Sequence, residues 1–275
     1  MKRTVVNEAY FTSSQVAEQC VDFVDHTYAL DSFDLIVEPS AGDGAFLRLL
    51  PEDKRIGLDI APQEPHVVQT DFLDWLPGHS GRILTVGNPP FGARASLAVK
   101  FIEHAAKYSE VIAFILPMSF NKYTFTNRVP LNFHLVDSMN ISDVFSLDGN
   151  DVPVNTVFQI WQKRDVLRAK QIGARSHPDF EMRHAHLSRV SPLQLQDLRQ
   201  GYDFAIAQVG NNFAPRDTSE LTKGSYWFIK AKCSDVQERF EALDFAFLDG
   251  MNLAHKSLSK ADIIAAYETV VQSQK

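Results

Sequence analysis

Cysteines and long apolar runs are scarce in this sequence. The two cysteines, Cys20 and Cys233, are far apart, which excludes a disulfide framework or a cysteine-based zinc motif and favours a reducing compartment. No apolar run approaches the roughly 18 residues that a membrane span needs, and the first residues are too polar for a signal peptide. We therefore expect a soluble, cytoplasmic protein that makes no membrane contact.

A strong charge of one sign is also missing. Lys and Arg number 27 and Asp and Glu 34, so the formal net charge is −7. The overall negative charge does not favour binding to polyanions, so any surface that binds nucleic acid must be confined to a small basic region. Residues 163–189 are the basic exception, with seven Lys or Arg against three Asp or Glu. This stretch fits either a solvated linker or a contact with phosphates.

Histidine patterns typical of metal sites or catalytic triads are absent. The nine histidines have no ligand or triad spacing, and the sequence therefore predicts no metal site.

Short apolar runs alternate with helical patterns through the first part of the 275-residue chain. Strands are predicted over 33–37, 55–60, 67–71, 83–86, 111–116, 144–147 and 156–161, and helices over 13–30, 45–50 and 95–108. This order predicts a doubly wound α/β sheet that ends in an antiparallel hairpin, with a turn at 148–151. A strand over 226–230 and a helix from Ser259 follow. We therefore expect a catalytic domain over 1–164 and a small α+β substrate-recognition or accessory region over 165–275.

A glycine-rich loop, Glu38-Pro39-Ser40-Ala41-Gly42-Asp43-Gly44, follows the first predicted strand. Glycine permits a tight turn and a close approach of backbone to ligand. The loop lacks the dinucleotide fingerprint, because Leu47 takes the place of the third glycine, and it lacks the Gly-Lys-Ser/Thr of a phosphate loop. It therefore favours a nucleotide-like cofactor without a pyrophosphate, although a plain glycine-rich turn is the alternative.

Acidic residues end the next two predicted strands. Open sheets of this kind bind ligands at the carboxyl ends of their strands. Asp59 ends the second strand, where a carboxylate accepts hydrogen bonds from ribose hydroxyls. Asp71-Phe72 ends the third, where a carboxylate and an aromatic ring suit an adenine amino group and its ring. Either acid also fits a solvated strand end.

Asn88-Pro89-Pro90-Phe91 directly follows the fourth predicted strand. Two prolines lack N–H groups and stiffen the backbone, so the Asn88 side-chain oxygen and a proline carbonyl can converge as two acceptors. Two acceptors suit an NH2 group, and engaging both hydrogens favours a pyramidal nitrogen whose lone pair can attack a methyl sulfonium. Phe91 offers a stacking face. We predict that these four residues are catalytic; the alternative is a rigid turn with Phe91 in the core.

Aromatic and cationic residues alternate after the fifth predicted strand. Phe120, Lys122, Tyr123 and Arg128 are the candidates for substrate binding. Stacking plus phosphate contact suits a nucleic acid, and an enzyme that acts on a base in a duplex must flip that base out. The same composition also fits an ordinary surface loop.

In order and spacing, these motifs resemble the amino-group methyltransferases of the class I S-adenosylmethionine-binding fold, especially the N6-adenine DNA methyltransferases. The resemblance covers about residues 10–163 and implies a Rossmann-like seven-stranded sheet with S-adenosyl-L-methionine as cofactor. The cofactor-binding residues that it implies are Tyr10, Phe11, Thr12, Glu38, Pro39, Ser40, Gly42, Asp43, Gly44, Asp59, Ile60, Asp71, Phe72 and Asn88. Of these, Tyr10-Phe11-Thr12 match the N-terminal motif that contacts the methionine part of the cofactor.

The resemblance implies a methyltransferase for the N6 amino group of adenine in nucleic acid, with DNA favoured over RNA. Adenine N6 or guanine N2 in RNA and glutamine in proteins stay open as acceptors, although the glutamine-modifying family usually has Tyr where this chain has Phe91. A silent nucleic-acid-binding scaffold is an alternative of another class. Such subunits usually lose the cofactor loop or the catalytic tetrapeptide, and this chain keeps both.

Overall fold

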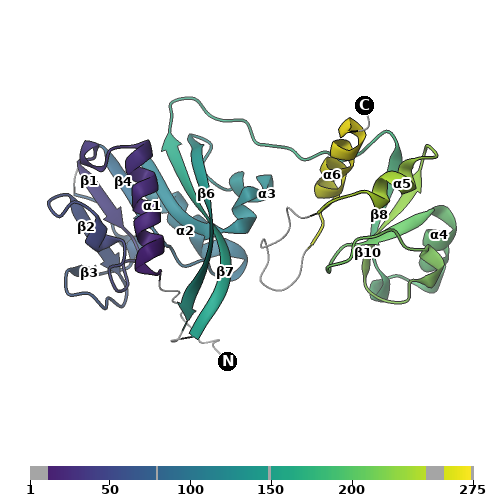
Figure 1. Ribbon diagram of the computed structural model, residues 1–275, viewed down its shortest axis with the longest axis horizontal. Helices are drawn as coiled ribbons and strands as arrows, with labels where there is room; N and C mark the ends of the chain where they lie inside the picture. Colours follow the sequence, from purple (N-terminus) through teal and green to yellow (C-terminus); the bar gives the residue numbers. More distant parts are fainter. Residues whose placement is uncertain (1–11, 79, 148–149, 246–256, 274–275) are drawn as a thin grey trace. The chain divides into compact units, whose positions relative to one another are not determined.

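Seven strands form one mixed sheet in the first part of the chain. They are β1 (Leu35–Glu38), β2 (Arg55–Asp59), β3 (Val67–Gln69), β4 (Ile83–Gly87), β5 (Val111–Pro117), β6 (Phe133–Leu147) and β7 (Asn150–Lys163). Their order is β3-β2-β1-β4-β5-β7-β6 (Figure 1). β1 to β5 are parallel, and β7 is antiparallel to both its neighbours. The predicted Rossmann-like, doubly wound seven-stranded sheet is confirmed.

The computed structural model describes residues 12–78, 80–147, 150–245 and 257–273. Two compact units divide the chain, 1–171 and 172–275. The sequence placed the division after residue 164, seven residues earlier. The middle of the predicted turn at 148–151 lies outside the described residues.

Both faces of the large sheet are covered, which explains the continuous apolar runs of its central strands. Helix α1 (Ser14–Thr27) begins after Ser13, whose side chain accepts a hydrogen bond from the backbone N–H of Val16, and it buries its apolar stripe in one core cluster. Helix α2 (Ser96–Ala105) buries its stripe in the cluster of the opposite face. Strand β5 supplies side chains to both clusters in alternation.

The helix predicted over 45–50 is wrong. Only a 3-10 turn, Leu47–Leu49, forms there. Leu47 packs tightly against β2: a Cβ atom on Gly57 would lie 2.8 Å from Leu47 Cδ2. The apolar pattern of this stretch comes from that packing.

The hairpin strands are longer than predicted. β6 starts at Phe133 and β7 ends at Lys163, whereas the apolar pattern indicated only 144–147 and 156–161. β6 is the edge strand of the sheet, and its exposed first half, residues 134–140, lacks the apolar runs that reveal a buried strand.

The second unit is an α+β fold. Its sheet has the antiparallel order β8-β10-β9, formed by β8 (Phe180–His186), β9 (Phe204–Ala207) and β10 (Ser225–Ala231). Its helices are α4 (Pro192–Gly201), α5 (Val236–Glu241) and α6 (Lys260–Ser273). The strand predicted over 226–230 and the helix predicted after Ser259 are confirmed, and the side chain of Ser259 accepts from the backbone N–H of Asp262.

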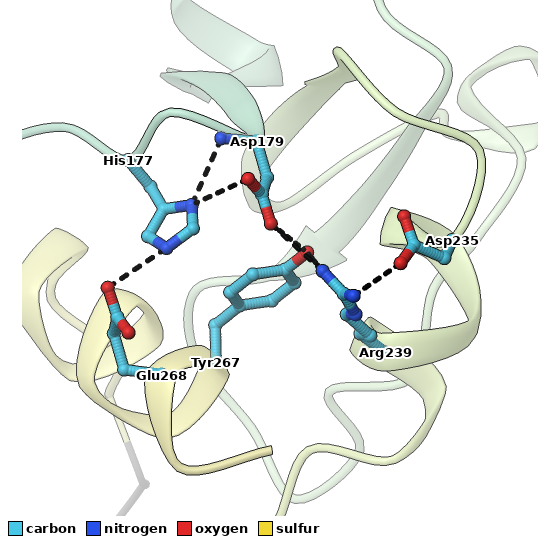
Figure 2. A network of polar contacts seen from close by, with 6 residues as sticks. All are labelled: His177, Asp179, Asp235, Arg239, Tyr267 and Glu268. Atoms are coloured by element: carbon cyan, nitrogen blue, oxygen red, sulfur yellow. Dashed lines mark hydrogen bonds and ion pairs between the residues drawn. The ribbon is translucent and has the colours of Figure 1, made fainter. Parts of the chain in front are cut away.

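A polar network joins the start of the second unit to its C-terminal helix (Figure 2). Tyr267 of α6 donates to Asp179 at 3.0 Å and accepts from Arg239 of α5 at 3.1 Å. His177 contacts Glu268 of α6 through Nε2 at 3.0 Å, and its Nδ1 accepts from the backbone N–H of Asp179. Burial of the Tyr267 ring raises the pKa of its hydroxyl to about 12, so the hydroxyl stays a donor at neutral pH.

No helix in the described part of the chain has both the length and the apolar character needed to cross a bilayer.

Candidate active site

Three distant segments of the first unit meet at the carboxyl ends of β1 and β4, where the strand order reverses direction. Ser40 follows β1, and its hydroxyl donates to the backbone oxygen of Asn88 at 2.9 Å. Asn88 follows β4, and its Nδ2 donates to Thr12 Oγ1 at 3.0 Å. Such a switch point is where doubly wound sheets bind ligands. The structure thus brings together three residues that the sequence assigned to one site.

The glycine-rich loop after β1 closes onto the end of β2. Gly42 and Gly44 have φ values of 50° and 80°, a left-handed conformation that favours glycine. The Gly42 N–H donates to Asp59 Oδ2 at 2.8 Å, and Ala61 N–H donates to Oδ1 at the same distance. Two backbone donors therefore fix the Asp59 carboxylate beside the loop. The next side chain, Ile60, is 54% exposed and leaves an apolar surface there.

Glu38 is the buried acid of the site. Its side chain is 2% exposed, and no partner is found for Oε2 among the described residues. Burial raises its pKa well above the usual range, and the Asp43 and Asp59 carboxylates act in the same direction, while the Leu47 N–H opposes them. An unpartnered carboxyl oxygen below a glycine loop fits a ligand that brings a hydrogen-bond donor or a positive charge.

The backbone of the tetrapeptide is pinned at both ends. The Asn88 carbonyl accepts from Ser40, and the Phe91 carbonyl accepts from the Leu97 and Ala98 N–H groups at 3.0 and 3.2 Å. The carbonyls of the two prolines are therefore the ones to consider for a substrate. The Phe91 ring is half-buried and packs against the clusters on both faces of the sheet.

The two residues of the pair after β3 have different surroundings. Asp71 is exposed, and its Oδ1 accepts from the Leu73 N–H at 2.9 Å. Phe72 is 1% exposed, and its ring lies 4.9 Å from the rings of Phe101 and His104. Phe72 thus belongs to the core, and Asp71 is the accessible member of the pair.

The predicted substrate-binding residues also differ in burial. Phe120 is fully buried against Phe125, which corrects the expectation that its ring is offered to a base. Its aromatic-and-cation context looked like a surface loop, but the ring fills the core below that loop. Lys122, Tyr123 and Arg128 are half-exposed.

Arg94 is a residue that the sequence reasoning missed. Its carbonyl accepts from Arg128 Nη1 at 3.2 Å, and its φ of 53° is left-handed, as is that of Ala95. The signal available in the sequence was a lone cation three residues after the tetrapeptide. Of the remaining predicted residues, Tyr10 and Phe11 lie outside the described part of the chain.

Within the described ranges, no group of three or more His, Cys, Asp or Glu side chains could hold a metal ion.

No protein-family model and no curated protein matches the chain, but solved structures are similar to part of it. A proposed RNA methyltransferase from Pyrococcus horikoshii is 14% identical, with a TM-score of 0.48 over 59% of this chain and 90% of its own. A proposed class I S-adenosylmethionine-dependent methyltransferase from Listeria monocytogenes is 14% identical, with a TM-score of 0.46 over 62% and 66% of the two chains. Magnesium protoporphyrin IX methyltransferase from Synechocystis, solved with bound S-adenosylmethionine, is 12% identical, with a TM-score of 0.40 over 55% and 79%.

Proposed function

We propose that this chain is an S-adenosylmethionine-dependent methyltransferase for the exocyclic N6 amino group of adenine in nucleic acid, with DNA as the favoured substrate. The observation that carries the proposal is the position of Asn88. Its side chain is oriented by Thr12, and its backbone is joined to the cofactor loop through Ser40.

The residues at the carboxyl edge fit this cofactor. Asp59 has a carboxylate fixed by backbone donors and suits ribose hydroxyls, Ile60 suits one face of the adenine, and Asp71 suits its amino group. Glu38, with its unpartnered buried oxygen, suits the positively charged end of the molecule. When bound, the cofactor supplies an electrophilic methyl group on a sulfonium.

The tetrapeptide positions the acceptor. Because Nδ2 of Asn88 donates to Thr12, Oδ1 is the atom of this amide that can accept from an incoming amino group. A carbonyl of Pro89 or Pro90 accepts the second hydrogen. Engaging both hydrogens draws the nitrogen lone pair out of conjugation with the ring, and Phe91 supports the planar base by stacking. No nucleophilic side chain takes part, and the proton leaves after the methyl group has been transferred.

The test is methyl transfer from labelled cofactor to separate pools of DNA, RNA and protein, followed by mass spectrometry of the nucleosides. We expect N6-methyladenine in the DNA pool. Asn88→Ala should abolish transfer, whereas Asn88→Asp, which keeps a side-chain acceptor, should retain part of it. Undiminished transfer by Asn88→Ala would refute the chemistry.

The identity of the labelled pool tests the acceptor separately. Label in RNA or protein alone would replace adenine in DNA with the corresponding acceptor. Label in none of the pools, together with tight cofactor binding, would favour the silent scaffold.

A further inference from the structure

Three segments of the first unit contain cations and no carboxylates. Residues 88–102, 118–134 and 168–171 hold no Asp or Glu, in a chain with 34 of them. The cations in these segments are Arg94, Lys100, Lys122, Arg128, Arg168 and Lys170. None of the ion pairs found among the described residues involves Arg94, Lys100, Arg128, Arg168 or Lys170.

Hydrogen bonds hold these segments together. Arg128 donates to the Arg94 carbonyl, which joins the second segment to the first. Asn127 and Gln171 exchange two bonds: Asn127 Nδ2 donates to the Gln171 carbonyl at 2.7 Å, and the Gln171 N–H donates to Asn127 Oδ1 at 3.0 Å. This exchange joins the third segment to the second, beside Arg128 and Lys170.

The direction of the chain explains how Lys170 comes to this place. β7 ends at Lys163, whose neighbour Gln162 pairs with Val111, the first residue of β5. Lys163 therefore lies at the amino edge of the sheet, away from the tetrapeptide. Residues 164–171 then run back along the β5-to-β6 crossover, through bonds to Asn132, Leu131 and finally Asn127. They carry Lys170 from the amino edge toward the segment that holds Arg128.

Arg168 anchors the return segment, residues 164–171, and its guanidinium is engaged with the protein rather than directed to solvent. Its guanidinium donates to the carbonyls of Thr126, Val129 and Phe133 and lies 5.4 Å from the Trp161 ring. Burial lowers its pKa. The bonds to Thr126 and Val129 satisfy carbonyls at and just after the end of helix α3 (Tyr123–Thr126).

Arg94 is held in a costly conformation close to the tetrapeptide. A left-handed backbone is unfavourable for a residue other than glycine, and two such residues, Arg94 and Ala95, are adjacent in the chain. Such strain is concentrated at functional sites. The bond from Arg128 fixes the Arg94 backbone, and the Arg128 guanidinium lies 5.3 Å from the Phe125 ring. The half-exposed Arg128 guanidinium is thus held at the backbone of exposed Arg94, three residues after Phe91 in the chain.

We propose that Arg94, Arg128 and Lys170 bind the phosphates of a polynucleotide that flanks the methylated base. The inference rests on the proposed function and deepens it, because it makes the acceptor part of a polymer rather than a free nucleoside or a protein side chain. Clustered cations without carboxylates suit a phosphate backbone. The half-exposed aromatic residue Tyr123 of α3 adds a stacking surface of the kind that single-stranded bases use.

The test is binding of the full chain to fluorescein-labelled oligonucleotides, followed by anisotropy across a series of KCl concentrations. Matched single-stranded DNA, duplex DNA and RNA identify the source of the phosphates. We expect Arg94→Gln and Lys170→Gln each to weaken binding roughly three- to tenfold and to reduce the log–log salt slope by about 0.7–0.9. Lys163→Gln is the matched control, an exposed lysine on the amino edge of the same unit, and it should leave both values unchanged.

Equal losses of affinity in Lys163→Gln and Lys170→Gln would overturn the proposed phosphate-binding site. Unchanged affinity in both Arg94→Gln and Lys170→Gln would do the same. Displacement of the oligonucleotides by polyglutamate at equal charge concentration would instead indicate an acidic protein partner. Because the binding measurement requires no methyl transfer, failure of the proposed phosphate-binding site can be distinguished from failure of the proposed reaction. Oligonucleotide binding with the expected losses but without transfer would refute the reaction alone.

Discussion

The hydrogen bond to Thr12 orients the Asn88 amide and so influences what this amide can offer a substrate. The nitrogen and oxygen of an amide have opposite hydrogen-bonding roles, and the Thr12 hydroxyl accepts from the nitrogen. Without that acceptor, Asn88 could rotate and present a donor to an amino group that needs acceptors. Thr12 therefore acts on the chemistry through Asn88.

We predict that Thr12→Val slows methyl transfer by about tenfold or more, since a lost buried hydrogen bond costs about 1–3 kcal/mol. Thr12→Ser keeps the acceptor and should stay close to the wild-type rate. Single-turnover transfer measures the effect, and cofactor affinity measured in parallel separates orientation of Asn88 from loss of the cofactor. Equal rates for the valine and serine variants would contradict this role.

Glu38 gives the stability of the chain a pH dependence. Burial raises the pKa of its carboxyl in the folded chain, so the folded chain keeps a proton that the unfolded chain releases above its ordinary pKa of about 4.3. The folded state then binds more protons than the unfolded state. As a result, this group lowers the free energy of unfolding as the pH rises from about 4.3 toward the raised pKa.

We therefore predict that Glu38→Gln stabilises the cofactor-free chain relative to the wild type, by an amount that grows as the pH rises above about 4.3. Urea unfolding of both proteins at pH values from 5 to 8 measures the difference. Glu52→Gln, at an exposed site, serves as the control. A difference that stayed constant with pH would show that the carboxyl is ionised in the folded chain.

Much of the site could be predicted from the sequence, but its contacts could not. The loop after β1, the acid that ends β2 and the tetrapeptide after β4 are each recognisable as local motifs. The bond between Thr12 and Asn88 joins residues 76 positions apart and follows only from the fold. The burial of Phe120 and Phe72 also depends on what packs above them, and composition carries no signal for it.

At the scale of elements, the central strands of the large sheet were predicted most accurately. β4 and β5 are apolar along their length and were predicted almost to the residue. The first half of β6 and the return segment 164–171 are largely exposed, and their apolar side chains face solvent rather than a core. Hydrogen bonds to distant residues hold these segments in place. Periodicity detects a buried face, so it does not detect these segments.

The junction between β4 and α2 depends on Gly92. Its φ of 67° and ψ of 176° lie in a region that is essentially limited to glycine, and a Cβ atom there would lie 2.9 Å from Leu97 Cβ. Both the backbone and the space therefore oppose any side chain. Because Gly92 follows Phe91 directly, a shift here also moves the tetrapeptide.

We predict that Gly92→Ala destabilises the chain by about 1–3 kcal/mol and also slows methyl transfer. Gly78→Ala is the matched control, because a Cβ atom at Gly78 meets nothing within 4 Å. Urea unfolding and transfer rates measure the two effects. If Gly92→Ala were as stable and as active as Gly78→Ala, the junction would be shown to tolerate a side chain.

At the scale of the whole molecule, the chain has separate cores in its two units. The clusters of the large sheet contain residues up to Trp161, and those of the small sheet start at Phe180. The sequence suggested a division after residue 164 through the change to a basic stretch that starts at residue 163, but residues 172–275 contain no motif that identifies their role. Two separate cores imply that damage to one unit can leave the other folded.

Removal of the Tyr267 hydroxyl tests whether the two units unfold independently. It joins α6 to Asp179 and Arg239 (Figure 2). Its loss leaves these two partly buried side chains with one partner fewer, at a cost of about 0.5–1.5 kcal/mol per bond. We predict that Tyr267→Phe increases hydrogen exchange in peptides covering 177–180, α5 and α6. Peptides from β1, β4 and β5 should keep their wild-type protection, and cofactor affinity should not change. Faster exchange in the strands of the large sheet would instead show that the two units unfold as one.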